Sequence, residues 1–281
     1  MTDSRTLGIL AGGGGLPSRV AAAGLAAGRR VFIVGLEGFA DPAALAPFPH
    51  VVLRIGAIGR ILAELRAQGC QDLVMIGTVR RPSLLTLRPD ADGARLLGRI
   101  GRAAFAGDDG LLAAITQVLS EEGFRILGAH EILTEALGPR GLLTKTGPDA
   151  QAMADIQRGI TVARALGAVD VGQGCVVQQG LVLAVEAAEG TDAMLARCVA
   201  LTRSGPGGVL VKLVKPGQER RADLPTIGSA TIANAVAAHL RGVAFEAEGT
   251  ILADREALVA AANAAGLFVL GLDPETIHKG S

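Results

Sequence analysis

The first 135 residues alternate short apolar runs with segments of helical pattern, and this alternation constrains the fold more than any other feature. The apolar runs expected to form strands are residues 7–11, 31–34, 51–55, 72–76 and 124–127. Segments with helical patterns, such as residues 18–27 and 58–68, separate them. Strands that alternate with helices usually form a parallel sheet covered by helices on both faces. We therefore predict an α/β fold whose N-terminal domain, residues 1–136, is a doubly wound, mostly parallel, Rossmann-like sheet.

The second half of the chain predicts a different kind of sheet. Glycines and prolines in residues 137–148 indicate a hinge-like linker, and residues 149–281 are expected to form a second α/β domain. Its first helix is predicted over residues 149–166. Strands are expected at 176–177, 181–185 and 209–214, and a strand–strand–helix–strand tail follows within 242–272. Two of these strands flank Gln178–Gly180, and the domain is expected to contain a mixed sheet.

Composition excludes several classes of protein. Hydrophobic residues make up 49% of the chain and aromatic residues only 2%, so the cores must be built from aliphatic side chains. The net charge of +0 and the scarcity of stacking aromatics argue against a nucleic-acid partner. Three widely spaced cysteines without a C-x-x-C pair argue against thiolate zinc sites and disulfide scaffolds. Without a signal-peptide pattern or an apolar run that could span a bilayer, a cytoplasmic protein is expected, with peripheral association at the inner membrane left open.

A run of glycines separates the first strand from the first helix. Compared with the dinucleotide fingerprint G-x-G-x-x-G, Gly12 and Gly14 match, but Pro17 takes the place of the third glycine. Glu37, after the second strand, stands where a ribose-binding acid could lie. A tight structural turn, a nicotinamide cofactor, and a phosphate or nucleotide without nicotinamide all remain open. The candidate ligand contacts are Gly12, Gly13, Gly14, Gly15 and Leu16.

Two other strand-to-helix connections of the N-terminal domain carry charged residues. Arg80 and Arg81 follow the fourth strand, and arginine pairs well with phosphate, although solvated surface arginines are an equal alternative. Asp108 and Asp109 precede a predicted helix, where capping and the helix dipole explain them most simply. Contact with a ligand is the second interpretation of this Asp pair.

The two loops with the most charged and polar residues lie in the second half of the chain. An acidic loop holds Glu186, Glu189, Thr191 and Asp192. Capping of the following helix could explain the last two residues but not the two glutamates. A second loop runs from Lys215 to Gly228 and mixes cations, carboxylates, an amide and a hydroxyl. This mixture suits an anionic substrate held together with a metal ion. The alternative is a solvated connection in which Asp223 and Thr226 cap a helix over residues 229–236, a helix expected to begin with a Ser or Thr cap.

Absent motifs narrow the chemistry further. The sequence contains no G-x-S-x-G elbow, no H-E-x-x-H pair and no G-x-x-x-x-G-K-[ST] phosphate loop, and its four histidines are scattered. What remains is chemistry of carboxylates with Lys, Arg and Gln. Mg²⁺ suits such a site, because it prefers oxygen ligands and is often shared with substrate phosphates.

Five blocks of the sequence together resemble one family, the LpxI-type UDP-2,3-diacylglucosamine pyrophosphatases. They occur in the family's order and cover residues 9–17, 77–82, 107–109, 184–192 and 215–228. The resemblance implies a two-domain, Mg²⁺-dependent enzyme of lipid A biosynthesis, with Mn²⁺ as a possible substitute. It implies hydrolysis of UDP-2,3-diacylglucosamine to UMP and 2,3-diacylglucosamine 1-phosphate (lipid X), with water attacking the α-phosphorus. Asp223 matches the acidic residue on which the family's catalysis depends.

Further roles follow from chemistry rather than from the resemblance. Asp223, with Glu189 or Asp192, is expected to hold the metal. The expected clamp on the diphosphate is Lys215, Gln218 and Arg221. The remaining substrate contacts are predicted at the glycine loop, Arg80, Arg81, Asp108, Asp109, Thr191 and Thr226. The resemblance implies a lipid-linked UDP-sugar as substrate, and a transiently contacted membrane surface and a second copy in a homodimer are the other expected partners. An NAD-linked oxidoreductase and a non-catalytic nucleotide-binding protein are the rival functions.

Overall fold

The computed structural model describes residues 5–80, 87–101 and 107–277. Contacts between Cα atoms divide the chain into two compact units. The first comprises Met1–Thr134 with Glu219–Asp223, and the second comprises Glu135–Gln218 with Leu224–Ser281.

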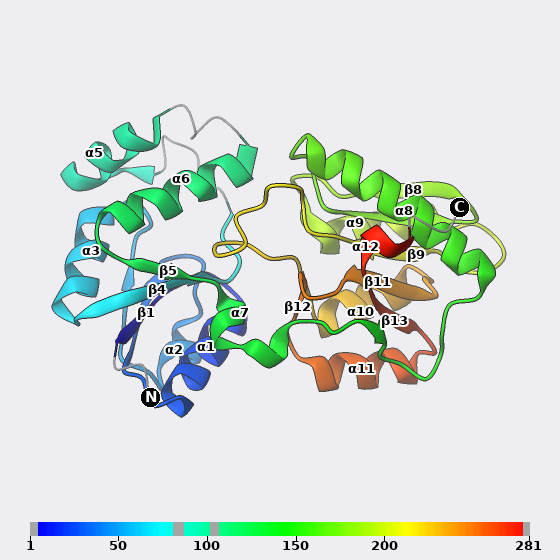
Figure 1. The fold of residues 1–281 in the computed structure, drawn as a ribbon, viewed down its shortest axis with the longest axis horizontal. Coiled ribbons are helices and arrows are strands. Elements are labelled where there is room, and N and C mark those ends of the chain that lie inside the picture. The colour runs from blue at the N-terminus through cyan, green and yellow to red at the C-terminus, as the bar shows by residue number, and fades with distance from the viewer. Residues whose placement is uncertain (1–4, 81–86, 102–106, 278–281) are drawn as a thin grey trace. The chain divides into compact units, whose positions relative to one another are not determined.

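The first unit contains the predicted doubly wound parallel sheet. Its strands are β1 (Thr6–Ala11), β2 (Val31–Leu36), β3 (His50–Leu53), β4 (Cys70–Ile76) and β5 (Arg125–Leu127). Their order is β3-β2-β1-β4-β5, and every pair is parallel (Figure 1). The chain builds outward from β1 to β3 and then returns to place β4 on the other side of β1. The carboxyl ends of β1 and β4 therefore form a topological switch point, where ligands bind in open α/β sheets.

Helices cover both faces of this sheet. They are α1 (Leu16–Ala26), α2 (Pro42–Leu45), α3 (Ile58–Ala67), α5 (Ala91–Ile100), α6 (Gly107–Glu121) and α7 (Ala129–Ile132). Side chains of α3, α5 and α6 form one core with alternate residues of β2, including Phe32 and Val34. A Cβ on Gly24 of α1 would lie 3.0 Å from Leu7, so α1 packs closely against the opposite face.

The second unit contains the mixed sheet that the sequence predicted. Its strands are β6 (Gly141–Leu142), β7 (Gly174–Gln178), β8 (Leu181–Val185), β9 (Val209–Lys212), β11 (Gly242–Glu246) and β13 (Phe268–Leu272). The order is β6-β13-β11-β9-β7-β8, with β9, β11 and β13 parallel and the remaining pairs antiparallel. A separate two-stranded sheet pairs β10 (Thr226–Ile227) with β12 (Ile251–Leu252). Residues 137–148, expected as a linker, contain strand β6 of the six-stranded sheet.

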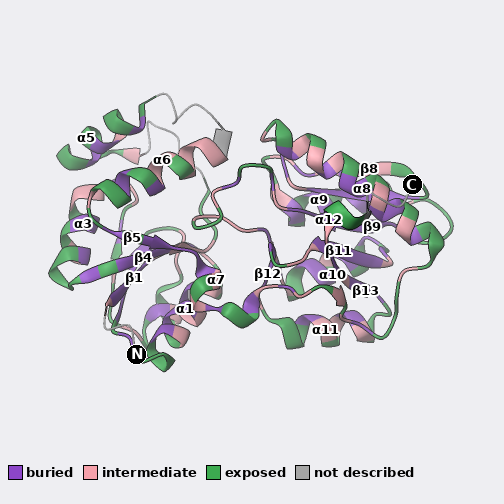
Figure 2. Cartoon of the chain, viewed as in Figure 1, coloured by how far each residue is buried: buried purple, intermediate pink, exposed green. Residues whose placement is uncertain are grey.

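The strands of both sheets are mostly buried, whereas the helices carry exposed outer faces (Figure 2). The helices of the second unit are α8 (Ala150–Ala168), α9 (Gly190–Cys198), α10 (Ser229–Ala237), α11 (Arg255–Ala264) and α12 (Pro274–Ile277), and a 3-10 turn, η2, spans Thr134–Ala136. Within the described part of the chain, no helix is both long and apolar enough to cross a bilayer.

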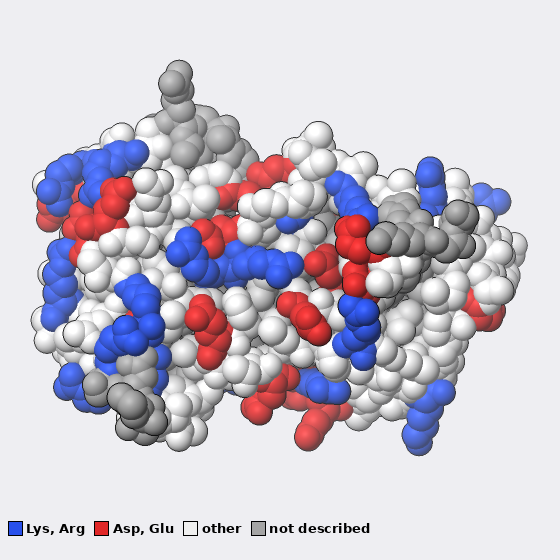
Figure 3. Space-filling model, viewed as in Figure 1, with Lys and Arg blue, Asp and Glu red and all other residues white. Residues whose placement is uncertain are grey.

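Acidic and basic side chains are interspersed on the surface. On the face drawn in Figure 3, Lys and Arg groups lie beside Asp and Glu groups rather than in one continuous field. This distribution agrees with the net charge of +0. The net charge therefore supplies no overall attraction for an anionic ligand.

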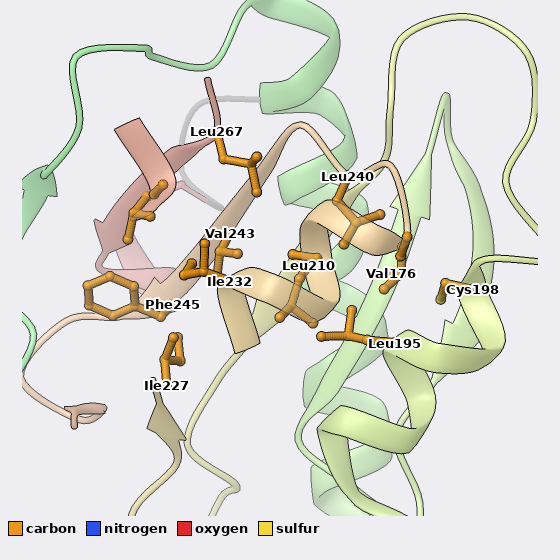
Figure 4. Packing of buried hydrophobic residues seen from close by; sticks show 14 of the residues in the cluster. Val176, Leu195, Cys198, Leu210, Ile227, Ile232, Leu240, Val243, Phe245 and Leu267 are labelled. Atoms are coloured by element: carbon orange, nitrogen blue, oxygen red, sulfur yellow. The ribbon is translucent and has the colours of Figure 1, made fainter. Parts of the chain in front are cut away.

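Alternate residues of β9 serve two separate cores in the second unit. Leu210 points into the core formed with α9, α10 and α11, together with Leu195, Ile232 and Phe245 (Figure 4). Its neighbours Val209 and Val211 belong to the core beneath α8. Lys212, the last residue of the strand, follows the parity of Leu210 and lies on the side of α9 and α10. A charged side chain thus ends a strand that is otherwise apolar on both faces.

The beginning of α10 differs from its prediction. The N-cap is Gly228, with extended backbone, and not a Ser or Thr. Thr231 lies three residues further on, and its hydroxyl accepts the Gly228 N–H at 3.4 Å. Thr226 lies in β10, and neither it nor Asp223 caps the helix. The capping explanation of the Lys215–Gly228 loop was therefore wrong.

All three cysteines are buried and free. Burial raises the pKa of the Cys70 thiol to about 11 and that of the Cys175 thiol to about 12. The Cys175 thiol donates to the carbonyl of Gly159 at 3.4 Å. Because the thiolate is the reactive form, these thiols are inert at neutral pH.

Gly159 of α8 provides a test of how tightly this helix packs. A Cβ at this position would lie 2.4 Å from Cγ2 of Val211, so Gly159→Ala forces the helix away from the sheet. Overpacking costs about 1–3 kcal/mol, which exceeds or cancels the gain of about 1 kcal/mol from alanine in a helix. We expect a lower melting temperature for Gly159→Ala. Gly98→Ala in α5 is the control, because a Cβ there meets nothing within 4 Å, and its melting temperature should stay equal or rise.

Candidate active site

The glycine loop lies at the switch point of the first sheet and is tied to the loop after β4. The Gly12 N–H donates to the carbonyl of Ile76 at 2.9 Å. Gly13 and Thr78 exchange two backbone hydrogen bonds, of 2.8 and 3.0 Å. The ends of β1 and β4 are thereby joined by their backbones alone.

The four glycines serve different purposes. A Cβ on Gly12 would lie 2.7 Å from the carbonyl oxygens of Gly77 and Thr78, so Gly12 is required by packing. Gly14 has a φ of +88°, and a Cβ on Gly14 or Gly15 would meet nothing within 4 Å. Gly15 is the N-cap of α1, and no side chain caps this helix end. A helix N-terminus at a switch point is where phosphates commonly bind.

Pro17 lies in the first turn of α1. Proline suits this position because its missing N–H would have no partner in the helix. The departure from G-x-G-x-x-G thus has a local structural reason. Glu37 is exposed directly after β2, so the position of the ribose-binding acid is also accessible.

The charged residues of the neighbouring loops are only partly described. Arg80 is exposed two residues after Thr78, whereas Arg81 lies outside the described residues. Asp108 and Asp109 lie in the first turn of α6, where negative charge interacts favourably with the helix dipole. Asp109 is half-buried, and the side chain of Asp108 lies outside the described part.

In the second unit, polar residues gather at the carboxyl edge of the sheet. Strands β8, β9 and β11 run in the same direction, so their carboxyl ends lie on one edge. Glu186 follows β8, Lys212 ends β9 and Glu246 ends β11. The Glu246 carboxylate accepts the Val214 N–H at 3.1 Å, which fixes the chain as it leaves β9.

A buried hydrogen-bonded chain connects two of these strand ends. The Lys212 ammonium donates to Thr191 Oγ1 at 2.7 Å and to the Thr226 carbonyl at 3.2 Å. The Thr191 hydroxyl donates to Glu186 Oε1 at 2.8 Å. Lys212 and Glu186 are each only 6% exposed. Sequence reasoning missed Lys212 as a site component, although a lysine within an apolar strand was a usable signal, and it noted Glu186 without giving it a role.

Lys215 and Gln218 form a tight turn after β9. Pro216 and Gly217 occupy its central positions, Gly217 has a φ of +78°, and the Gln218 N–H donates to the Lys215 carbonyl at 3.1 Å. The Gln218 side-chain carbonyl accepts the Lys215 N–H at 3.0 Å. The Lys215 ammonium lies 2.6 Å from Oδ1 of Asp170, two residues after the end of α8. Both Lys215 and Gln218 are buried, so in this conformation their side chains stabilise the loop.

The next turn contains Asp223. Arg221 donates to Glu219 through Nε at 2.8 Å and through Nη2 at 2.7 Å. This paired hydrogen bond holds the pKa of the Glu219 carboxyl below its usual range and raises the pKa of Arg221. The N–H groups of Ala222 and Asp223 both donate to the Glu219 carbonyl at 3.0 Å. Asp223 is half-buried at the end of this turn, three residues before Thr226.

The carboxylates predicted as metal ligands have protein partners. Glu189 is the N-cap of α9 and forms an ion pair with Arg197. A backbone hydrogen bond, together with Arg197, lowers the pKa of Glu189. Asp192 accepts a hydrogen bond from Asn234 at 3.0 Å. Over the residues that the structure describes, no group of three or more His, Cys, Asp or Glu side chains is placed to hold a metal ion.

Substitutions in the glycine loop separate packing from ligand contact. We expect Gly12→Ala to lower the melting temperature, because its Cβ would overlap two carbonyl oxygens. Gly15→Ala should leave the melting temperature unchanged, since the site is open and its φ of −85° is ordinary for alanine. If Gly15→Ala were the more destabilising change, our assignment of the two positions would be incorrect.

Comparison with known proteins agrees with this two-part organisation. A family model described as "LpxI N-terminal domain" matches residues 6–136, and one described as "LpxI C-terminal domain" matches residues 139–270. The chain is 48% identical over 277 residues to UDP-2,3-diacylglucosamine pyrophosphatase LpxI of Caulobacter vibrioides (strain ATCC 19089 / CIP 103742 / CB 15). The alignment covers 96% of this chain and 99% of the relative. With both domains matched in order and nearly the whole length aligned, the chain belongs to the LpxI family.

Proposed function

We propose that this protein hydrolyses UDP-2,3-diacylglucosamine to UMP and 2,3-diacylglucosamine 1-phosphate, and so takes part in lipid A biosynthesis. The observation that carries the proposal is the 48% identity to an LpxI enzyme over nearly the full length of both chains. The substrate carries two acyl chains, so we also propose transient association of a cytoplasmic protein with the membrane surface.

The geometry of the loops supports a diphosphate substrate. The N-terminus of α1 lies at the switch point without a side-chain cap and is suited to a phosphate. The glycine loop before it pairs with Thr78, and the exposed Arg80 follows two residues later. We assign the nucleotide side of the substrate to this region. In the loop between β9 and β10, Lys215 and Arg221 carry positive charge next to Asp223 in the sequence. Direct contact with the diphosphate requires them to exchange Asp170 and Glu219 for substrate oxygens.

The proposed metal ligands are Asp223 with Glu189 or Asp192. Their chemistry fits Mg²⁺ or Mn²⁺, because all are carboxylate oxygens. In the described structure Glu189 pairs with Arg197 and Asp192 with Asn234, so binding of the ion requires these carboxylates to leave those partners. When bound, the ion would supply positive charge that offsets the charge of the diphosphate.

The proposed reaction forms one bond and breaks one. A water oxygen bonds to the α-phosphorus, and the bond from that phosphorus to the bridging oxygen breaks, which releases the lipid phosphate. Asp223 would hold the water or its proton close to the phosphorus, and its turn is closed by the Ala222 and Asp223 N–H groups, which donate to the Glu219 carbonyl. Positive charge from Lys215 and Arg221 would stabilise the leaving phosphate.

Hydrolysis in ¹⁸O-labelled water tests the activity and the site of attack together. With UDP-2,3-diacylglucosamine and Mg²⁺, we expect UMP that carries the label, because attack at the α-phosphorus leaves the new oxygen on UMP. EDTA in place of Mg²⁺ should abolish turnover. Label in 2,3-diacylglucosamine 1-phosphate would reverse the assignment of the attacked phosphorus, and the absence of UMP would contradict the proposed function.

Asp223→Asn tests the central carboxylate. The amide keeps the size of the side chain, so the melting temperature should be unchanged, whereas loss of the charge should lower kcat by about 10²-fold or more. Glu248→Gln is the matched control, because it neutralises an exposed carboxylate of the second unit outside the proposed site. Near-normal turnover by Asp223→Asn would remove this residue from the mechanism.

A further inference from the structure

We propose that Lys212 is a positioning residue that ties the acidic loop after β8 to the segment following Asp223. The expected effect on turnover rests on the proposed function, whereas the expected effect on the mobility of the two loops does not. Lys212 contacts Thr191, in the first turn of α9, and the carbonyl of Thr226, in β10. Through Thr191 it is linked to Glu186, the residue that follows β8.

The free energy of burial argues that this cluster has a purpose beyond packing. Lysine and glutamate are almost never fully buried unless they are paired, because each charge loses its hydration. Here the two charges do not touch and are bridged by one hydroxyl. Oε2 of Glu186 is buried and finds no hydrogen-bond partner among the described residues. Apolar side chains would fill such a position at lower cost, so stability alone is a poor explanation.

The direction of each hydrogen bond is determined by chemistry. An ammonium can only donate, and a carboxylate can only accept. Thr191 must therefore accept from Lys212 and donate its single proton to Glu186. Because the Thr191 hydroxyl already donates to Glu186, it cannot also donate to a substrate phosphate in this conformation. Thr191 then acts as the link between two charges and not as a direct ligand of the diphosphate.

The hydrogen bond from Lys212 to the Thr226 carbonyl connects the Lys212–Thr191–Glu186 chain to the segment that follows Asp223. The Lys215–Gln218 turn, closed by two hydrogen bonds between these residues, fixes the chain before Asp223. The bond from Lys212 to the Thr226 carbonyl fixes it afterwards, where β10 pairs with β12. Asp223 lies between these two anchors in the sequence. A shift of about 1 Å in a catalytic group can cost about 10²-fold in rate, so the second anchor should matter for turnover.

The test compares Thr191→Val with Thr191→Ser. Valine keeps the shape of threonine and removes both hydrogen bonds, whereas serine keeps the hydroxyl. We expect Thr191→Val to lower kcat by about 10-fold or more, with little change in KM, and Thr191→Ser to restore most of the activity. Amide hydrogen exchange should become faster in residues 186–192 and 224–228 of Thr191→Val and remain unchanged in Thr191→Ser.

A second variant, Lys212→Met, removes the bonds to Thr191 and Thr226 while leaving the Thr191–Glu186 bond possible, and it should accelerate exchange mainly in residues 224–228. Unchanged kcat in folded Thr191→Val, or unchanged exchange in residues 224–228 of both variants, would overturn the proposal. So would unfolding of both variants, which would make the cluster purely structural. If the wild-type protein releases no UMP, the proposed function fails, whereas the exchange measurements still decide whether Lys212 anchors the loop.

Discussion

Parallel pairing of strands is the constraint on which the rest of this structure depends. It requires helical connections, which bury both faces of each sheet, and it places the carboxyl ends of neighbouring strands on one edge. The strands are consequently apolar along their length, and polar residues concentrate where they end. Gly12 after β1 and Lys212 at the end of β9 follow this rule, and Glu186 follows the antiparallel edge strand β8.

Local pattern was sufficient to predict most of the elements. The predicted strands of the first sheet and the turn between β7 and β8 were confirmed. They could be predicted because apolar periodicity and glycines within a few consecutive residues indicate them. The start of α10 was not predicted correctly, since both Ser229 and Gly228 are acceptable N-caps and the extended backbone at Gly228 decided between them. The proposed roles of the site residues stay predictions.

The loop contacts could not be predicted because the interacting side chains are far apart in the sequence. Nothing near Lys215 indicates that its ammonium lies beside Asp170, and nothing near Lys212 indicates Thr191. Such contacts depend on the packing of whole elements. They also show that many loop charges are balanced in pairs, as in Arg221 with Glu219 and Arg197 with Glu189. Binding of an anion in these loops therefore means exchange of one set of oxygens for another.

The burial of all three cysteines has a practical consequence. Cys70, Cys175 and Cys198 are enclosed, and burial raises the pKa of each thiol. The native protein therefore offers no thiolate to an alkylating probe at neutral pH. One cysteine introduced at an exposed position of each unit would be labelled selectively, without removal of the natural cysteines. A pair of fluorophores attached in this way could report the distance between the two units as substrate is bound and product is released.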